Sequence, residues 1–275
     1  YVNKINISGN TRTVDKVIRR EFSLTEGDAY NKFAINYSKD SIRALNFFSD
    51  VEVDEVRTDF PDKLNLEIKV EEKNTGEASL GAGYSSANST SLNVGLKESN
   101  FLGKGQKVNL SSSFSNTRNT YDISITEPYF NNKQLSLTGN IYSSFTDPTS
   151  ANYETEDIGV GLKARFPLSP NIFLQTRYSL FTAKVKADEN ATAYERLLAG
   201  TDTNSTIGYT LNFDKRNSRY KPSSGFNFEI DQDIAGLGGT SYYIKNRIVY
   251  NSYKRLSNEL IGAFKFQAGS SNGYN

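Results

Sequence analysis

The sequence contains no cysteine, histidine, methionine or tryptophan among its 275 residues. Without cysteine and histidine there are no thiol or imidazole nucleophiles and no histidine general base, and the usual ligand sets for zinc and haem are missing. Disulfide bonds are excluded for the same reason. Most enzyme mechanisms depend on these residues, so we expect a protein that is not an enzyme and that carries no metal and no cofactor.

A long hydrophobic run and a strong net charge are also lacking. No apolar stretch approaches the ~20 residues that a membrane-spanning helix requires, and the mean hydropathy is −0.57. The formal net charge of +1 gives no reason to expect nucleic acid as a partner. A helical membrane protein is therefore excluded. A β-barrel is not, because its strands alternate lipid-facing and polar side chains and so lower the mean hydropathy.

The first part of the sequence combines strand and helix periods. Residues 2–7 alternate like a strand, apolar residues recur at helical spacing over 14–22 and from about 31 to 45, and two further alternating runs lie near residues 51–56 and 64–70. This order predicts a strand, two helices and two strands, which form an α+β domain over residues 1–73. For the second helix we expect one buried side, composed of Phe33, Ala34, Tyr37, Ser41, Ala44 and Leu45.

From Gly76 onward apolar residues occur at every second position. Leu135, Leu137 and Ile141, for example, alternate with polar side chains such as Ser136. About eleven such runs lie between residues 74 and 275, each near the ~10-residue length of membrane-barrel strands. The pattern predicts an all-β antiparallel transmembrane barrel, present in part, with apolar side chains toward lipid and polar side chains toward a lumen.

The connections between these runs alternate in length, as they do in outer-membrane barrels. Residues 128–133, 166–171 and 253–259 form short connections, whereas residues 146–154 and 187–203 form long polar ones. A two-sheet β-sandwich also alternates, and it is the competing interpretation of the pattern. A sandwich would bury Leu135, Leu137 and Ile141 between two stacked sheets.

Two kinds of strand residue are candidates for special roles. Gly81 and Gly83 lie inside a predicted strand, which suits either a strand that opens and closes or a place of close backbone approach or tight curvature. Aromatic side chains near strand ends are expected to form membrane-belt anchors: these are Tyr129, Phe130, Phe145 and Phe166.

Charged residues give weaker signals. Six cations share the polar side of the predicted strands, and we expect most of them to be solvated or paired: Lys163, Arg165, Arg177, Lys245, Arg247 and Lys265. Glu154, Glu156 and Asp157 could in principle supply the paired carboxylates of a glycoside hydrolase. A mobile acidic loop is the simpler interpretation of these three residues.

Several short motifs, in the same order, resemble the BamA family of outer-membrane assembly factors. Residues 2–28 together with Phe47-Phe48 are similar to a polypeptide-transport-associated (POTRA) repeat, the last one before the barrel. Residues 72–76 resemble the junction of that family, residues 100–105 its second turn, and residues 126–130 the end of its fourth strand. The resemblance covers essentially the whole chain.

The resemblance implies the central subunit of the machinery that folds and inserts β-barrel proteins into the Gram-negative outer membrane, with the POTRA domain in the periplasm. In that family the first strand borders a weak seam, the lateral gate, which pairs with a substrate strand by β-augmentation. The corresponding first-strand edge here is Glu77, Ala78, Ser79, Leu80, Gly81, Ala82, Gly83 and Tyr84.

The implied partners are unfolded outer-membrane β-barrel substrates, accessory periplasmic lipoproteins of the BAM complex, and outer-membrane lipid, but no nucleic acid. The docking residues that we predict in the POTRA domain are Arg19, Arg20, Glu21, Val51 and Val53. A polypeptide-secretion or translocation pore of the same superfamily is the alternative function. Since the barrel of that family has about sixteen strands, and its Arg-Gly-Phe loop and aromatic-ended last strand are missing here, we expect part of a longer protein.

Overall fold

The computed structural model describes residues 1–85, 89–148, 151–219, 221–257 and 259–274. The chain forms two compact units, Tyr1–Ala78 with Leu96–Val108, and Ser79–Gly95 with Asn109–Asn275. The first unit contains a small α+β domain, and the second contains most of a large sheet. In the described residues no helix has the length and apolar character needed to cross a membrane.

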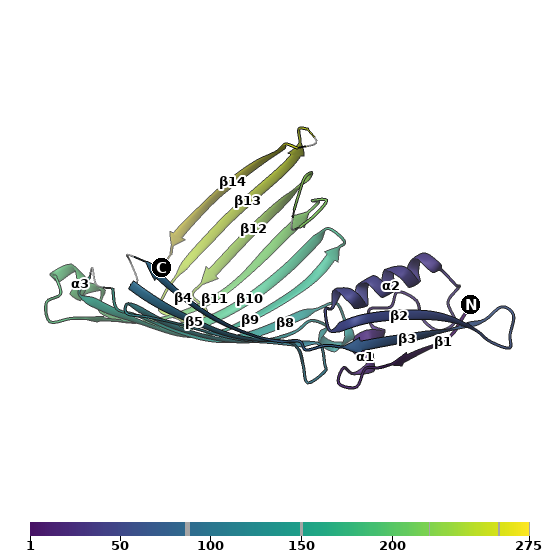
Figure 1. Ribbon diagram of the computed structural model, residues 1–275. Coiled ribbons are helices and arrows are strands. Elements are labelled where there is room, and N and C mark those ends of the chain that lie inside the picture. Colours follow the sequence, from purple (N-terminus) through teal and green to yellow (C-terminus); the bar gives the residue numbers. More distant parts are fainter. Residues whose placement is uncertain (86–88, 149–150, 220, 258, 275) are drawn as a thin grey trace. The chain divides into compact units, whose positions relative to one another are not determined.

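The α+β domain has its five elements in the predicted order: β1 (Val2–Ser8), α1 (Asp15–Arg19), α2 (Lys32–Ala44), β2 (Phe48–Arg57) and β3 (Leu64–Glu72). The central strand β3 is parallel to β1 and antiparallel to β2 (Figure 1). Asn31 begins α2, because its side chain accepts hydrogen bonds from the backbone of Phe33 and Ala34. The helices and strands share one apolar core, which includes Phe47 and Phe48.

The buried side of α2 differs from the prediction. Phe33 and Tyr37 are 80% and 61% exposed, whereas Ile35, Ser38 and Ile42 are buried. Ser38 can lie inside because its hydroxyl group is hydrogen bonded twice. It donates to the carbonyl of Ala34 at 2.8 Å and accepts from the Ser23 N–H at 3.0 Å. The aliphatic residues at positions 35 and 42 therefore set the helix face, and the two aromatic residues turn outward.

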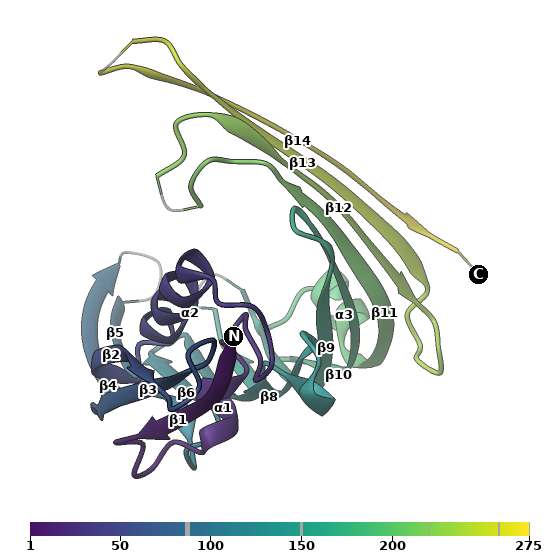
Figure 2. The same cartoon turned by 90° about the vertical axis from the view of Figure 1, so that its right-hand side faces the viewer.

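Eleven strands form the second sheet: β4 (Gly76–Ser85), β5 (Ser89–Phe101), β6 (Gln106–Ser115), β7 (Arg118–Glu127), β8 (Ser136–Thr146), β9 (Tyr153–Ser169), β10 (Ile172–Ala187), β11 (Gly200–Asp214), β12 (Gly225–Ala235), β13 (Tyr243–Arg255) and β14 (Ile261–Gly273). Each strand lies next to the one that follows it in sequence, so β4 and β14 are the two outer strands. Neighbours from β7 to β14 are antiparallel. Figure 2 shows the curvature of this sheet from β8 to β14.

The predicted alternation is confirmed by the register. One row across β7 to β10 consists of Ile123, Ile141, Val160 and Leu180, all exposed on what we call the apolar face. The adjacent row points to the other side, the polar face, and contains Ser124, Asn140, Gly161 and Ser179. Ile141 is 58% exposed on a single sheet, so the β-sandwich interpretation is wrong.

One long connection contains more structure than expected. The prediction of a polar loop over residues 187–203 missed a short helix, α3 (Ala193–Leu198), and β11 already begins at Gly200. Thr192 and Glu195 form a capping box that stabilises this helix. A helix of six residues is too short for its apolar period to be recognised against the loop around it. The short connection after β7 contains the turn η1 (Phe130–Asn132).

Candidate functional site

The first strand of the large sheet, β4, is exposed at all ten of its positions. It is hydrogen bonded to β5 on one side, and no other described strand borders it. Leu80 and Tyr84 are 76% and 82% exposed. All eight residues predicted for the first-strand edge, residues 77–84, lie on this strand. An unpaired row of backbone N–H and C=O groups is a template for a further strand.

Of the two glycines inside β4, Gly81 is not explained by crowding. A Cβ added to Gly81 would have its nearest neighbour, the Cβ of Asn93, at 4.0 Å, and neither Gly81 nor Gly83 has a positive φ. Gly83 is tighter, with the Ser91 hydroxyl at 3.2 Å. Close backbone approach therefore does not apply to Gly81. A strand weakened by the high backbone entropy of glycine stays a prediction.

We predict that Gly81→Val stiffens β4. A β-branched residue favours extended backbone by about 1 kcal/mol over glycine, so amide hydrogen exchange in β4 should slow about fivefold. Hydrogen exchange measured by mass spectrometry tests this. Gly139→Val on β8 is the control. The prediction fails if both variants slow amide hydrogen exchange in β4 equally.

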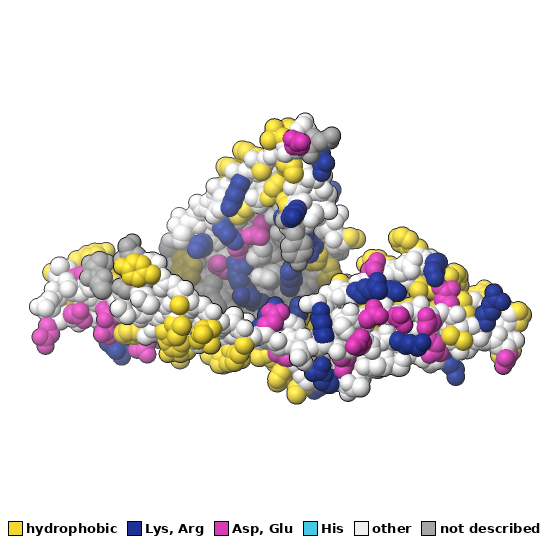
Figure 3. Space-filling view, viewed as in Figure 1, with side chains coloured by type: hydrophobic (Ala, Val, Ile, Leu, Met, Phe, Trp, Pro, Cys, Tyr) yellow, Lys and Arg dark blue, Asp and Glu magenta, His cyan; other side chains and the backbone are white. Residues whose placement is uncertain are grey.

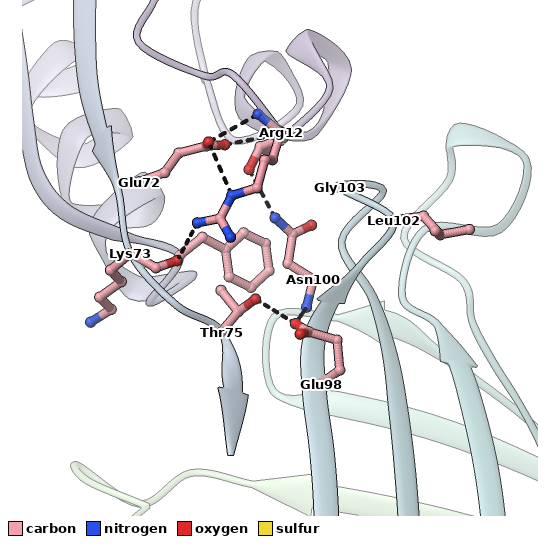
Figure 4. Close-up of a pocket in the computed structure, with 10 residues that line it drawn as sticks. Arg12, Glu72, Lys73, Thr75, Glu98, Asn100, Leu102 and Gly103 are labelled. Carbon is pink, nitrogen blue, oxygen red and sulfur yellow. Dashed lines mark hydrogen bonds and ion pairs between the residues drawn. The ribbon is translucent and has the colours of Figure 1, made fainter. Parts of the chain in front are cut away.

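The chain that enters β4 is held firmly by the carboxylate of Glu72 at the end of β3. It accepts hydrogen bonds from the Thr11 hydroxyl at 2.8 Å and from the backbone N–H groups of Arg12 and Thr13 at 2.9 and 2.6 Å. The Arg12 guanidinium lies 3.6 Å away and also donates to the carbonyl of Lys73. Glu72, Arg12, Thr13 and Lys73 line a cavity of about 390 Å³ within the first unit (Figure 4).

The pKa of Glu72 is strongly lowered. Burial raises it, but the hydrogen bonds from Thr13, Thr11 and the Arg12 backbone outweigh burial and bring the pKa to about 2. Because the folded pKa lies below the unfolded one, the stabilisation is complete above about pH 4.5 and is lost as the pH falls toward 2.

We predict that Glu72→Gln lowers the free energy of unfolding of the first unit by about 3 kcal/mol at pH 7. The stability of the variant should also depend less on pH. The measurement is the protection of the Arg12 and Thr13 amides against hydrogen exchange between pH 3 and 7. The matched control is Glu71→Gln, because Glu71 is exposed on the same strand. A similar loss of protection in both variants would contradict this role of Glu72.

The turn between β5 and β6 also fastens the first unit. Asn100 donates from its side chain to the Thr13 hydroxyl at 2.8 Å and accepts from the Gly105 N–H at 2.7 Å. The carbonyl of Gly103 accepts from the Val14 N–H at 2.9 Å. Figure 4 shows Leu102 turned away from these contacts. The sequence marked residues 100–105 only as a turn, and nothing local indicated which segment the turn would meet.

The beginning of β4 is fixed to the same turn region. Thr75 and Glu98 are hydrogen bonded through their side chains, the Ser99 N–H donates to the Thr75 carbonyl at 3.3 Å, and Lys97 lies 3.8 Å from Glu77. The strand is therefore anchored where it starts, and its glycines come after the anchor.

The predicted docking residues have different surroundings. Val51 is completely buried and Val53 packs on the core, so neither side chain is presented to a partner as the α+β domain is folded. Arg20 and Glu21 form an ion pair at 3.7 Å and are largely covered. Arg19 is half-exposed beside Asp15 and Glu26. Docking through Arg19 stays a prediction.

The four belt aromatics divide between the two ends of the strands. Tyr129 and Phe130 follow β7, and Phe166 lies near the end of β9, which is the same end of the sheet, whereas Phe145 lies near the opposite end of β8. Phe130 is 46% exposed. Aromatic girdles at both membrane interfaces would have this distribution, and the assignment stays a prediction.

No described residues form a group that could hold a metal ion. Glu154 and Glu156 lie on β9, not in a loop, opposite Lys186 and Lys184 of β10. Lys186 is 3.9 Å from Glu156. Cross-strand pairing with lysine gives these carboxylates a structural explanation.

Comparison with known proteins agrees with this architecture. The POTRA model, described as a surface antigen variable number repeat, matches residues 1–73, and the model of the Omp85 superfamily domain matches residues 100–275. The outer membrane protein assembly factor BamA of Nitratidesulfovibrio vulgaris is 28% identical over 94% of this chain and 33% of its own length. The chain thus spans about a third of the length of this and two other BamA relatives.

Solved structures share the fold. The crystal structure of BamA from Haemophilus ducreyi lacking POTRA domains 1–3 has a TM-score of 0.83 at 24% identity, covering the whole chain and 56% of that structure. CdiB from Escherichia coli has a TM-score of 0.62 at 12% identity, covering 99% of this chain and 54% of that structure.

The predicted resemblance and the predicted location are confirmed: the sheet belongs to the outer membrane and the α+β domain to the periplasm. The superfamily model covers well over half of the chain, and the POTRA match lies directly before it. With eleven strands in sequential order behind a βααββ domain, this chain belongs to the Omp85 superfamily.

Proposed function

We propose that this chain is the membrane part, with the adjoining POTRA domain, of a factor that folds and inserts β-barrel proteins into the outer membrane without covalent chemistry. The observation that carries the proposal is β4, an outer strand exposed at every position and bordered only by β5 among the described strands. The assembly-factor names of the relatives support it. We place the domain boundary between residues 73 and 74, where β3 has ended.

The proposed mechanism is β-augmentation. An incoming strand pairs with the free backbone groups of β4, and these hydrogen bonds supply affinity with little demand on sequence. Between Gly76 and Gly83 the strand consists mostly of small residues, which leaves the backbone accessible. In the membrane the unpaired edge has no water to bond, so pairing with a substrate strand removes a large penalty.

The anchor at the start of β4 gives this pairing a direction. Glu98 holds Thr75, and the contacts of Glu72 fix the chain just before it. We infer that the outer edge of β4, the edge away from β5, opens at its Ser85 end first. The beginning of the strand stays in place.

Accessory periplasmic proteins are the proposed partners of the POTRA domain. Arg19 is the predicted docking residue with an exposed charge, and it lies at the end of α1 beside two carboxylates. Partner binding through this residue should weaken with salt, because exposed ion pairs are screened.

Reconstitution tests the proposed function. The full-length protein in lipid vesicles should accelerate insertion of an unfolded β-barrel substrate over empty vesicles. Successive N–H groups of a strand point toward opposite edges, and proline has no N–H. Replacing both Leu80 and Gly81 with proline therefore removes one N–H from the outer edge of β4, and this double variant should abolish the acceleration. The control is the same pair at Phe266 and Gln267 of β14, which lies at the far end of the described sheet from β4. Equal activity of the two variants would refute the proposal.

A polypeptide-secretion pore is the second candidate, because the CdiB fold is shared and the polar face carries many charged side chains. A pore should pass ions continuously through planar bilayers and should export a polypeptide without inserting it. An assembly factor should insert substrates whether or not the pore conducts.

A further inference from the structure

A hollow of about 620 Å³ lies on the polar face between β9 and β13. Figure 3 shows Lys and Arg side chains gathered in this part of the sheet, with an acidic group among them. Six cations and three carboxylates line the hollow: Lys163, Arg165, Arg177, Arg216, Arg219 and Arg247, with Asp214, Glu229 and Asp231. We call it the basic hollow, because its cations outnumber its carboxylates.

Four of the six cations have carboxylate partners. Arg177 pairs with Asp231 and Asp233, Arg247 with Glu229 and Asp231, and Arg216 and Arg219 both with Asp214. These ion pairs join strands β10, β12 and β13 and hold the wall of the hollow. Their charge is largely compensated within the protein.

Lys163 and Arg165 have no carboxylate within ion-pair distance in the described part of the chain. They stand two residues apart on β9 and so share a face, and both are exposed. Their cross-strand neighbours are Arg177 and Gln175 on β10 and Thr138 and Ser136 on β8. The uncompensated positive charge is therefore concentrated on the β9 side of the basic hollow.

A second hollow of about 620 Å³ adjoins the first and shares Arg165, Phe173 and Arg219 with it. The guanidinium groups of Arg165 and Arg219 lie 4.8 and 5.1 Å from the centre of the Phe173 ring. Its other walls are rich in proline and aromatic residues: Pro128, Tyr129, Phe166, Pro167 and Pro170. An apolar wall thus begins where the unpaired cations end.

This juxtaposition selects one class of ligand. An inorganic anion would use only the cations, and a hydrocarbon chain would use only the apolar wall. Guanidinium and ammonium groups bind carboxylates, aromatic and proline surfaces bind apolar side chains, and both hollows have the size of ligand sites. A polypeptide segment with carboxylates beside apolar residues uses both parts.

We propose that Lys163 and Arg165 bind an acidic polypeptide segment on the polar face of the sheet, with its carboxylates on these two cations and its apolar side chains against Phe173 and Pro167. This site is separate from strand pairing at β4, so it stands or falls independently of the proposed assembly function.

Fluorescence anisotropy with the full-length protein in detergent tests the site. The probes are a fluorescein-labelled peptide of alternating glutamate and phenylalanine and the same peptide with glutamine for glutamate. The glutamate peptide should bind, and the glutamine peptide should bind about tenfold more weakly. The double variant K163Q/R165Q should bind the glutamate peptide about tenfold more weakly than the unchanged protein does. K107Q/K265Q, which removes the same charge from residues outside both hollows, should change affinity less than about twofold.

Equal weakening in K163Q/R165Q and K107Q/K265Q would overturn the proposal, because binding would then reflect only overall charge. It would also be overturned if glycerol phosphate displaced the peptide at concentrations where free glutamate did not, since the occupant would then be a phosphate group. Neither measurement involves substrate insertion, so loss of the peptide site and loss of assembly activity are distinguishable.

Discussion

Gly103→Ala is expected to destabilise the first unit by about 2–4 kcal/mol. Gly103 has φ +70, where a non-glycine residue is strained, and its Cβ would overlap the carbonyl oxygen of Arg12. The turn would have to move, and the hydrogen bond from the Val14 N–H to the Gly103 carbonyl would be lost. Urea unfolding, followed through hydrogen exchange of residues 11–15, measures the loss.

Gly27→Ala is the matched control for this prediction. Gly27 also has a positive φ, +98, but nothing lies within 4 Å of the added Cβ. It should therefore show only the backbone strain, about 1 kcal/mol. If the two variants were equally destabilised, the packing of the β5–β6 turn against residues 12–14 would contribute nothing, and the anchoring of β4 would need another explanation.

The second large effect is expected at Arg177. Its guanidinium donates to Asp233 and to the Thr210 hydroxyl at 2.8 and 2.7 Å and pairs with Asp231, and all three charged side chains are at most one-quarter exposed. Arg177→Gln removes the ion-pair partner of Asp233 and leaves Asp231 with Arg247 as its partner, which should cost roughly 3 kcal/mol because both carboxylates are partly buried. The measurement is the unfolding temperature of the sheet in detergent, followed by circular dichroism.

Two further variants test whether the partly buried ion pairs of Arg177 cause this loss of stability. Gly208 lies opposite Arg177, and a Cβ there would collide with the Asp233 carboxylate. Gly208→Ala should therefore lower the unfolding temperature without removing a charge. Lys186→Gln breaks an ion pair of half-exposed residues and should change stability by less than about 0.5 kcal/mol. A similar effect at Lys186 and Arg177 would show that burial of the ion pair is irrelevant.

The sequence was sufficient for the sheet because a strand has a side-chain period of two, which a run of ten residues displays several times. Ile141 and Ser136 were assigned to opposite faces from this parity alone, and the register agrees. The number and order of strands followed, since consecutive strands in a meander pair with their neighbours.

Helical faces were harder to predict. In α2 the choice between Phe33 with Tyr37 and Ile35 with Ile42 depends on which side meets the sheet, and both sets have helical spacing. The buried Ser38 misled the prediction, because its hydroxyl is satisfied by partners that only the folded chain brings together.

The candidate site could be predicted only in part. Residues 77–84 were identified through resemblance, and their exposure agrees with an outer strand. The bond between Asn100 and Thr13 joins residues 87 apart, and no local pattern encodes such a distance. Val51 was chosen for docking although its alternating position placed it in the core. The role of Gly208 depends on an arginine reaching across a strand, which requires the register to be known.

The most direct test of the central claim is a photo-crosslinking amino acid placed at Ala82 of β4 or at Leu174 of β10, which has strands on both sides. During substrate insertion by the full-length protein, we predict several-fold stronger crosslinks to the terminal strand of the substrate from Ala82. Crosslinks of equal strength from Leu174 would contradict a template function of the first strand.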